Sequence, residues 1–441
     1  MDPLTYARAQ MGLSLAFHMA FAAAGVALPL FMVVADVMHA KTGDRDYLEF
    51  SRRMAKGTSI LFAVGAVSGT VLSFELGLLW PNFMGTFGEV VGLPFALEGF
   101  AFFTEAIFLG IYLYGRGRIP PRAHLFAGVG VAASGALSAG FVTLVNACMN
   151  LPAGFDMVGG KVAHVDPVAA MFSPPWRYEV VHALLACYQA TAWALAAIHA
   201  AVLLRHPTSS LFRKAFAISL AVACATALLQ PLSGDRSAKH VAAMQPAKLA
   251  ASEALFHTEA HAPLRVGGLP DPATGEVRFD VEIPSGLSLL AFDDPAAEVK
   301  GLDAVPRDEW PPVVATHLAF EVMVGAGSAM AALALVAIAL WWRKKAVPTA
   351  RRFLLAVVAC GPLGLVAMEA GWCVTELGRQ PWIVRGAMRT SQAVTPFHYL
   401  EAPFWTFGAV YAFLGGTVLY LLYRQLRAAP VEAGPPTVRH A

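Results

Sequence analysis

The fold is decided by stretches such as residues 313–342, which read VVATHLAFEVMVGAGSAMAALALVAIALWW. This stretch contains one carboxylate, Glu321, and neither lysine nor arginine. A helix that crosses a membrane needs about 20 mainly apolar residues. The stretch meets that requirement, so it predicts a membrane-spanning helix.

Eight further stretches meet the same requirement. In chain order the nine predicted spans are residues 11–35, 57–80, 93–114, 124–148, 180–204, 215–232, 313–342, 353–375 and 403–423. The 441-residue chain is 57% hydrophobic and only 14% charged, whereas a soluble domain carries roughly 25% charged residues. This composition excludes a soluble multidomain enzyme. The near balance of 32 basic and 30 acidic residues gives no indication of nucleic acid binding.

Basic residues are concentrated in alternate connections between the spans. The connections after the first, third, fifth and seventh spans hold groups of lysine and arginine, while the connection at 81–92 holds none. Basic connections stay on the cytoplasmic side of a membrane. The N-terminus and the loop after the sixth span are therefore predicted to lie outside, and the C-terminus in the cytoplasm.

The connection at 234–312 is long and polar. Within it, residues 276–283 alternate like a short strand between turn signals. The predicted organisation is six spans in 1–233, an outer loop at 234–312, three spans in 313–424 and a disordered cytoplasmic tail at 425–441. The predicted fold class is an all-α polytopic membrane protein, with nine transmembrane helices and a long outer loop between helices six and seven.

The charged residue types inside the spans are all acidic. Five glutamates lie there, without aspartate, lysine or arginine: Glu75, Glu98, Glu105, Glu321 and Glu369. Charged groups in a membrane are costly and indicate function by default. Either these carboxyl groups are protonated, or a group that is not protein supplies the positive charge, as a bound metal cofactor would.

Three further residues in the spans have side chains that can bind haem iron, namely His18, His182 and Met323. Each alone also fits a helix-packing role. Counted inward from the predicted outer ends, these residues, Glu98 and Glu369 all lie within about ten residues, or roughly 15 Å. The shared depth predicts a layer of cofactors beneath the outer loop.

Glu98 and Glu105 lie on one face of the third span. Their spacing is two helical turns, or about 10 Å along the axis. Such a pair suits a proton route from the inner side to a reaction site in the outer half. A helix-packing carboxylic acid is the alternative interpretation for Glu105.

Several motifs resemble those of subunit I of the cytochrome bd oxidases. Residues 245–253 read QPAKLAASE and are similar to the QPxKLAAxE motif in that family's quinol loop. Residues 369–372 read EAGW and residues 378–382 read GRQPW, which both match the family. Residues 96–99 read ALEG and precede Glu105, as in its paired-glutamate helix. The outer loop resembles that of the short-loop type.

The resemblance implies three haem groups and their ligands. His182 and Met323 look like the axial pair of a low-spin haem b. His18 and Glu369 look like axial ligands of a high-spin haem b and of haem d, or a third haem b in its place, and which ligand serves which haem stays open. Arg379 is similar to a residue that offsets haem propionates.

The resemblance also implies catalytic roles. Lys248 and Glu253 look like quinol-site residues, with Glu253 expected as a base in a partly wet outer loop. Glu98 resembles a residue at or beside the oxygen-reducing haem, and Glu105 resembles its neighbour in proton delivery.

The implied function is that of a ubiquinol or menaquinol oxidase subunit in the respiratory electron transport chain of a bacterial plasma (inner) membrane. It would oxidise quinol at the outer face and reduce O₂ to water with protons taken from inside. A second large membrane subunit, subunit II, is implied as a partner, together with small single-span subunits in some members.

One departure from the family favours an alternative. Two positions before Met323 the family typically has arginine, where this chain has Glu321. The alternative function is a divergent haem membrane protein, a sensor or an electron-transfer subunit, that lacks oxygen reduction. A secondary transporter with protonatable glutamates is a third reading, which the missing internal repeat disfavours.

Overall fold

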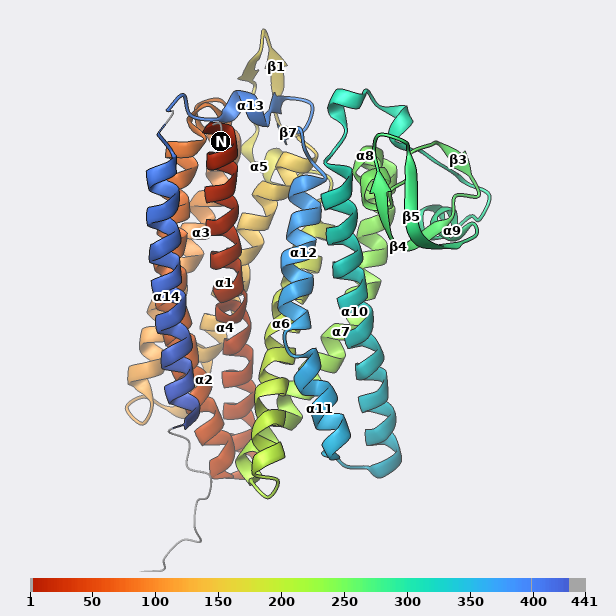
Figure 1. Ribbon diagram of the computed structural model, residues 1–441. Coiled ribbons are helices and arrows are strands. Elements are labelled where there is room, and N and C mark those ends of the chain that lie inside the picture. The colour runs from red at the N-terminus through yellow and green to blue at the C-terminus, as the bar shows by residue number, and fades with distance from the viewer. Residues whose placement is uncertain (1–2, 398, 428–441) are drawn as a thin grey trace, which may run out of the picture.

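The computed structural model describes residues 3–397 and 399–427. Within them, nine helical segments are long and apolar enough to cross a membrane, which confirms the predicted number. They stand side by side in one bundle (Figure 1). The segments are α1 (Pro3–Thr42), α2 (Arg45–Leu79), α3 (Pro81–Gly115), α4 (Pro121–Asn150), α6 (Trp176–Arg205), α7 (Ser210–Met244), α10 (Val313–Lys344), the pair α11 (Arg351–Cys360) and α12 (Leu363–Leu377), and α14 (Glu401–Arg427).

Most helices are longer than the predicted spans, because hydropathy locates the apolar part of a helix and not its polar ends. The clearest case is α7, which continues to Met244 and so includes the first part of the loop predicted to begin at 234. Its polar end is held by Lys239, which pairs with Asp235 at 3.3 Å and with Asp293 at 2.6 Å. Similarly, α14 reaches Arg427; the rest of the predicted tail, 428–441, lies outside the described residues.

The predicted eighth span is divided into α11 and α12. Proline lacks the backbone N–H that an α-helix needs, and Gly361 and Pro362 lie at the break. Both parts pack closely against α6. A Cβ added at Gly361 would lie 2.4 Å from the Ala197 Cβ, and one at Gly364 would lie 2.5 Å from the Ala190 Cα. These glycines set the position of α12, which carries Glu369.

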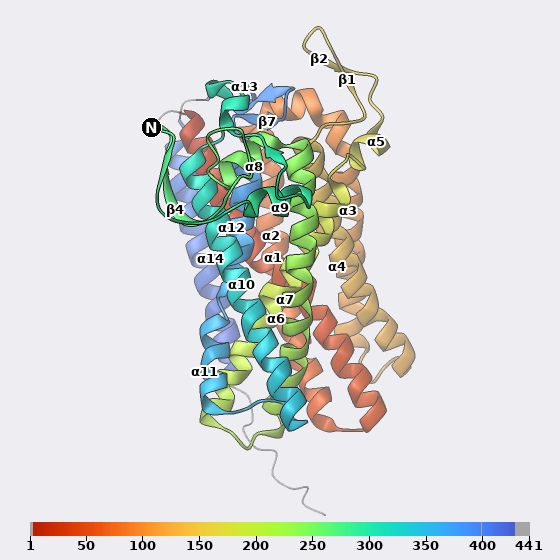
Figure 2. The ribbon, with the colours of Figure 1, turned by 90° about the vertical axis from the view of Figure 1, so that its right-hand side faces the viewer.

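The outer loop is a folded lobe with its own small core. It contains α8 (Pro246–Ser252), β3 (Glu259–Ala260), β4 (Leu264–Asp271), β5 (Glu276–Ile283), α9 (Gly286–Phe292), β6 (Glu298–Val299) and the 3₁₀ turns η1 (Leu302–Ala304) and η2 (Arg307–Glu309). The strand predicted at 276–283 is β5, paired antiparallel with β4. The core of the lobe includes Leu249, Leu255, Phe256, Leu287 and Leu302. Figure 2 shows the lobe against the upper part of α7 and α10.

Shorter elements cover the same end of the bundle. A hairpin of β1 (Asp156–Val158) and β2 (Lys161–Ala163) and the helix α5 (Pro167–Met171) join α4 to α6. The segment of β7 (Trp382–Val384), β8 (Met388–Arg389) and α13 (Thr390–Ala393) joins α12 to α14. The start of α1 lies at this end too (Figure 1).

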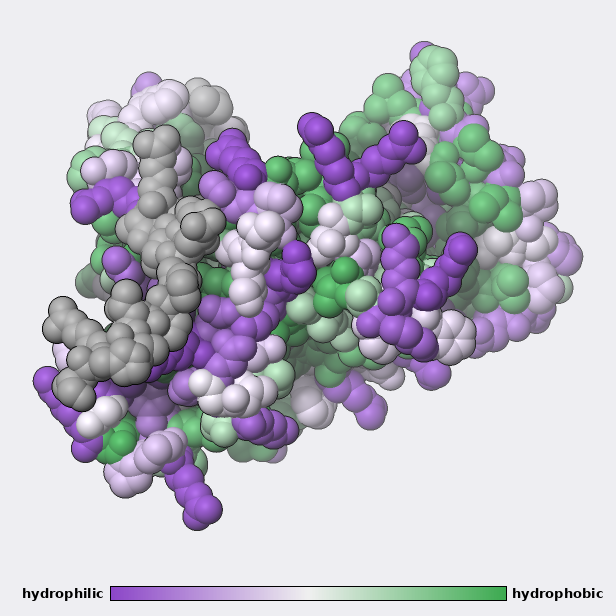
Figure 3. Space-filling model, turned by 90° about the horizontal axis from the view of Figure 1, so that it is seen from below, coloured by the Kyte–Doolittle hydropathy of each residue, from purple (hydrophilic) through white to green (hydrophobic). Residues whose placement is uncertain are grey.

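The opposite end carries the connections that hold the groups of basic residues. Seen from below, hydrophilic side chains form separate groups there, with hydrophobic side chains between them (Figure 3). Some are tied to carboxylates, since Arg116 donates to Asp36 at 3.2 Å and Lys214 pairs with Asp46 at 2.6 Å. The basic connections thus share one end, as the positive-inside pattern requires.

Replacing Gly364 by alanine should weaken the contact between α12 and α6. The added Cβ would overlap the Ala190 backbone, and such overpacking costs about 1–3 kcal/mol. We expect a lower thermal unfolding temperature of the purified protein in detergent. The matched control is Gly325→Ala on α10, where a Cβ meets nothing within 4 Å. Equal unfolding temperatures for the two variants would contradict the packing role.

Candidate functional site

His18 lies on α1 with its ring against α2. Its Nδ1 is 2.9 Å from the Ser68 hydroxyl, whose hydrogen is donated to the Val64 carbonyl. The hydroxyl oxygen therefore accepts from Nδ1–H, which leaves Nε2 unprotonated. Histidines that bind metals usually have their other nitrogen held in this way. Gly69 allows the close approach, since a Cβ there would be 3.2 Å from the His18 Cε1.

Glu98 and Glu105 both face α4 from α3. The Ser138 hydroxyl donates to Glu98 Oε1 at 3.0 Å. Glu105 is 6% exposed, and a Cβ at Gly135 would be 3.2 Å from its Oε2. The two carboxyl groups therefore line the α3–α4 interface, on the common face that their spacing indicates.

His182 lies on α6 against α7. Its Nε2 is 3.1 Å from the side-chain nitrogen of Gln230, which also donates to the His182 carbonyl at 3.2 Å. Its Nδ1 is buried and has no hydrogen-bond partner among the described residues. Sequence reasoning did not identify Gln230, although a polar residue before Pro231 in an apolar span was an available signal.

Met323 lies on α10 and contacts α12, the helix that carries Glu369. A Cβ added at Gly371 would be 2.9 Å from the Met323 sulfur, so the glycine of the EAGW motif admits the thioether. Both Glu369 oxygens are buried, and neither has a hydrogen-bond partner in the part of the chain that the structure describes. An unpaired buried carboxylate is costly. Thioether, imidazole and an unpaired carboxylate together fit the ligand chemistry of haem iron.

A buried polar network connects the outer lobe to the bundle. Lys248 of α8 donates to the Asn150 side-chain oxygen at 2.6 Å. Asn150 donates to Glu179 Oε1 at 3.0 Å and to the Asn146 side-chain oxygen at 2.7 Å. Asn146 in turn donates to Glu376 Oε1 at 2.6 Å. Of these residues only Lys248 was predicted; the four-residue spacing of the two asparagines at the end of α4 was the available signal.

Arg379 joins this network through Glu376, since the Arg379 Nη2 is 2.5 Å from the Glu376 Oε2. The Arg379 Nε and Nη1 atoms are buried and have no partner among the described residues. Two free donors of a planar guanidinium suit a carboxylate, such as a haem propionate. The residue before Arg379 has to be a glycine, because a Cβ at Gly378 would be 2.7 Å from the Lys248 Cγ. The GRQPW motif therefore makes room for the lysine of the outer lobe.

The two expected quinol-site residues lie in different surroundings. Burial lowers the pKa of the Lys248 amine, and the nearby Glu179 opposes this effect. Glu253, at the other end of α8, is 5% exposed, and its Oε2 is buried without a partner among the described residues. Burial, reinforced by the Glu321 carboxylate and opposed by Arg265, raises the pKa of Glu253 to about 8.

The expectation that Glu253 lies in a partly wet loop is therefore wrong. The reason is tertiary: α8 is buried from Lys248 to Ser252 because the core of the lobe packs around it. A carboxyl group in this position holds a proton more tightly than a wet one, which brings its protonation change close to neutral pH.

Glu321 and His317 hold the lobe to α10. Glu321 Oε2 accepts a hydrogen bond from the Gly267 backbone N–H at 2.7 Å. The His317 ring lies between two backbone carbonyls, with Nδ1 2.8 Å from the Ser252 oxygen and Nε2 3.2 Å from the Gly267 oxygen. The glutamate that departs from the family pattern thus has a partner in the lobe.

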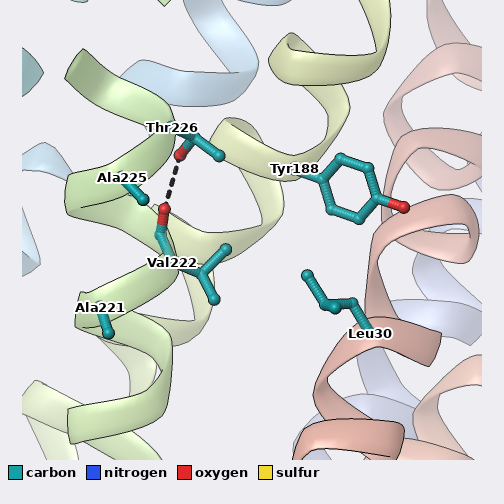
Figure 4. Close-up of a pocket in the computed structure, with 6 residues that line it drawn as sticks. All are labelled: Leu30, Tyr188, Ala221, Val222, Ala225 and Thr226. Atoms are coloured by element: carbon teal, nitrogen blue, oxygen red, sulfur yellow. Dashed lines mark hydrogen bonds between the residues drawn. The ribbon is translucent and has the colours of Figure 1, made fainter. Parts of the chain in front are cut away.

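A pocket of about 460 Å³ lies apart from these residues. It is lined by Leu30 of α1, Tyr188 of α6 and four residues of α7 (Figure 4). The hydroxyl of Thr226, one of the four, donates to the Val222 carbonyl at 2.8 Å. The lining is mostly aliphatic and carries no carboxylate or imidazole, so it does not belong to the site.

Comparisons with known proteins agree over nearly the whole chain. The family model of cytochrome bd terminal oxidase subunit I matches residues 6–430. A Bacillus subtilis protein named "Putative cytochrome bd menaquinol oxidase subunit I" is 38% identical, covering 98% of each chain. A second Bacillus subtilis protein, named cytochrome bd ubiquinol oxidase subunit 1, is 29% identical over 97% of this chain and 94% of its own.

The solved structure of bd oxidase from Geobacillus thermodenitrificans is similar as well. It has a TM-score of 0.90 and 39% identity, covering 97% of this chain and 99% of the other. These comparisons favour neither the sensor nor the transporter. The chain therefore belongs to the cytochrome bd terminal oxidase subunit I family, and it is a multi-pass, haem-binding membrane subunit of a quinol oxidase.

Proposed function

We propose that quinol is oxidised at the end of the bundle that carries the lobe, and that protons for oxygen reduction enter from the opposite end. The observation that carries this proposal is the buried network from Lys248 to Arg379. It links the QPAKLAASE segment of the lobe to the helices that hold the candidate haem ligands. In this proposal the N-terminus and the lobe face outward, and the C-terminus faces the cytoplasm of a bacterial cell.

Four side chains would hold the haem iron atoms. His182 and Met323 would bind a low-spin haem b, while His18 and Glu369 would bind a high-spin haem b and haem d, or a third haem b. The free Nε2 of His18 and the unpaired oxygens of Glu369 support these roles. Bound haem supplies the iron that carries electrons and reduces oxygen. Arg379 would offer its free Nε and Nη1 donors to propionates.

At the quinol site, Glu253 would take a proton and Lys248 would stabilise the developing quinolate oxygen. A general base works best with a pKa near the operating pH, and burial places that of Glu253 at about 8. The two relatives' names differ between menaquinol and ubiquinol; either quinol suits a site built on one acid–base group and one amine.

Protons would reach the oxygen-reducing site along the α3–α4 interface. Glu105 would take them first and Glu98 would receive them, with the Ser138 hydroxyl holding the Glu98 carboxyl group. Protons released at one face and consumed from the other would build a membrane potential. As a subunit I, the chain is one part of a multi-subunit oxidase; we propose subunit II and small single-span subunits as its partners.

Replacing Met323 by leucine should remove the low-spin haem signal from the reduced-minus-oxidised absorption spectrum. The exchange keeps the volume of the side chain, so the helix packing should survive. The control is Met330→Leu on the same helix, which is 1% exposed and lies in the hydrophobic core. A normal low-spin spectrum in the Met323 variant would show that this sulfur is not a ligand.

Glu253→Gln should lower quinol-driven oxygen uptake by about 100-fold, the low end for losing a general base. Lys248→Ala, which removes the amine that would stabilise the quinolate oxygen, should lower it as well. Haem content should be unchanged in both variants. Because the Glu253 carboxylate forms as the pH rises through about 8, quinol turnover of the unmodified protein should increase over that range. The Glu253→Gln variant should lack this increase.

The control for both variants is Lys300→Ala, in an exposed part of the lobe. An artificial electron donor that bypasses quinol should support equal oxygen uptake in the unmodified protein and in all three variants. Full quinol turnover in either site variant would rule out its assigned role.

Glu105→Gln should slow oxygen reduction by about tenfold or more while leaving reduction of the haems by quinol fast, because only proton delivery is interrupted. Stopped-flow absorption separates the two steps. The control is Glu89→Gln, an exposed position on the same helix. If oxygen reduction proceeds at the normal rate in the Glu105 variant, α3 does not deliver the protons.

A further inference from the structure

The β4–β5 hairpin of the outer lobe has apolar side chains on its outward face. Val266 pairs with Val281, and Leu264 pairs with Ile283, so the four side chains share one face. Leu264 packs against the core of the lobe, whereas the other three are exposed. Val266 is 49% exposed, Val281 66% and Ile283 47%. This face is therefore uncovered over much of its area in the described chain.

The opposite face of the hairpin is polar, and its Arg265 and Asp280 side chains are largely covered by the protein. Arg265 donates to the Ala254 carbonyl at 3.2 Å and pairs with Asp280 at 3.2 Å and with Glu282 at 3.0 Å. An antiparallel sheet in water usually has its apolar face inward and its polar face outward. The hairpin reverses this order, which indicates that the medium on its outer side is not water.

Phe279 extends this apolar face at an unusual backbone position. Its side chain is 91% exposed, and its φ of +64° lies in the left-handed region, which is a genuine outlier for a bulky residue. Gly268, at φ +105°, lies across from it where the pairing of the two strands is interrupted. The backbone is therefore strained at Phe279, whose aromatic ring is exposed on the outside of the lobe.

The depth of the hairpin follows from its contact with α10. Gly267 donates to Glu321, which lies eight residues after the start of α10, or about 12 Å along its axis. From Val322 to Trp342 the chain has 21 residues without a charge, a length of about 32 Å. The hydrocarbon core of a membrane is about 30 Å thick. Glu321 and Gly267 therefore lie at the edge of that core.

Polarity along the hairpin agrees with this depth. Its turn lies beside η2, since Arg307 donates to the Pro272 carbonyl at 2.8 Å, and it carries the polar residues Asp271, Thr274 and Glu276. The Leu264–Ile283 end points the other way and continues into α9. There Leu290 and Phe292 are 47% and 41% exposed. Figure 1 shows this lobe beside the upper part of α7 and α10, not above them.

We propose that the outward face of β4–β5 and α9 inserts into the lipid leaflet at this end of the bundle. This lipid-facing surface comprises Val266, Phe279, Val281, Ile283, Leu290 and Phe292. We favour lipid over a protein as the occupant because the hairpin residues change from polar at the turn to apolar at the opposite end, and this change coincides with the membrane edge inferred from Glu321. Amphipathic elements bind membrane interfaces in this way, with the apolar face buried about 5–10 Å. The proposal does not depend on the quinol site.

Lipid nitroxide quenching tests this surface directly. The whole oxidase with Phe279→Cys carries a fluorophore at that cysteine, in nanodiscs of phosphatidylcholine and phosphatidylglycerol with acyl-chain nitroxide lipid. The matched control is Thr274→Cys in the turn. Nitroxide lipid should quench the label at 279 at least threefold more than the label at 274, and aqueous iodide should show the reverse order. Unsubstituted protein corrects for labelling of the five native cysteines.

Two results would overturn the proposal. One is lipid quenching that is equal at 279 and 274. The other is a photo-crosslink from residue 279 to a second copy or to another subunit, which would identify a protein as the occupant. Should Phe279→Cys lose its haem spectrum and so fail to fold, Val281→Cys takes its place with the same expected quenching.

Discussion

An unpaired carboxylate inside the bundle is the constraint on which the rest of the structure depends. Neither Glu369 oxygen has a hydrogen-bond partner among the described residues, and a charge in that state is not stable within a membrane. Two donor atoms of Arg379 and the Nδ1 of His182 also lack hydrogen-bond partners among the described residues. Glycines allow close packing around these residues, as Gly364 does between α12 and α6 and Gly378 does beside Arg379. In the proposed function, haem would supply the charge and the acceptors that these side chains lack.

Hydrogen bonds join the outer lobe to the bundle on two sides. Lys248 leaves α8 and reaches Asn150 at the end of α4, in space that Gly378 leaves open. His317 and Glu321 hold the lobe from the other side, through backbone groups of Ser252 and Gly267. Glu321, where the resemblance predicts arginine, is therefore a tie between α10 and the lobe.

The span count and the β5 strand were predictable because each depends on composition over a short window. The end of α7 was not, since its polar last turns are stabilised by Lys239 pairing with a residue of the lobe, Asp293. For the site, residue types near the motifs identified Lys248, Arg379 and Glu369. Asn146, Asn150, Glu179 and Glu376 were missed because their role arises from contacts between helices far apart in sequence.

By itself the sequence determined a nine-span membrane protein of this family, because apolar length and a few short motifs are local properties of the chain. Only the tertiary structure decided which groups are buried and what faces them. The packing of the lobe around α8 buries the Glu253 carboxyl group. The β4–β5 hairpin exposes the side chains of Val266 and Val281. Burial and partner are set by packing between distant segments, and it is burial that gives these side chains their charge state and their chemistry.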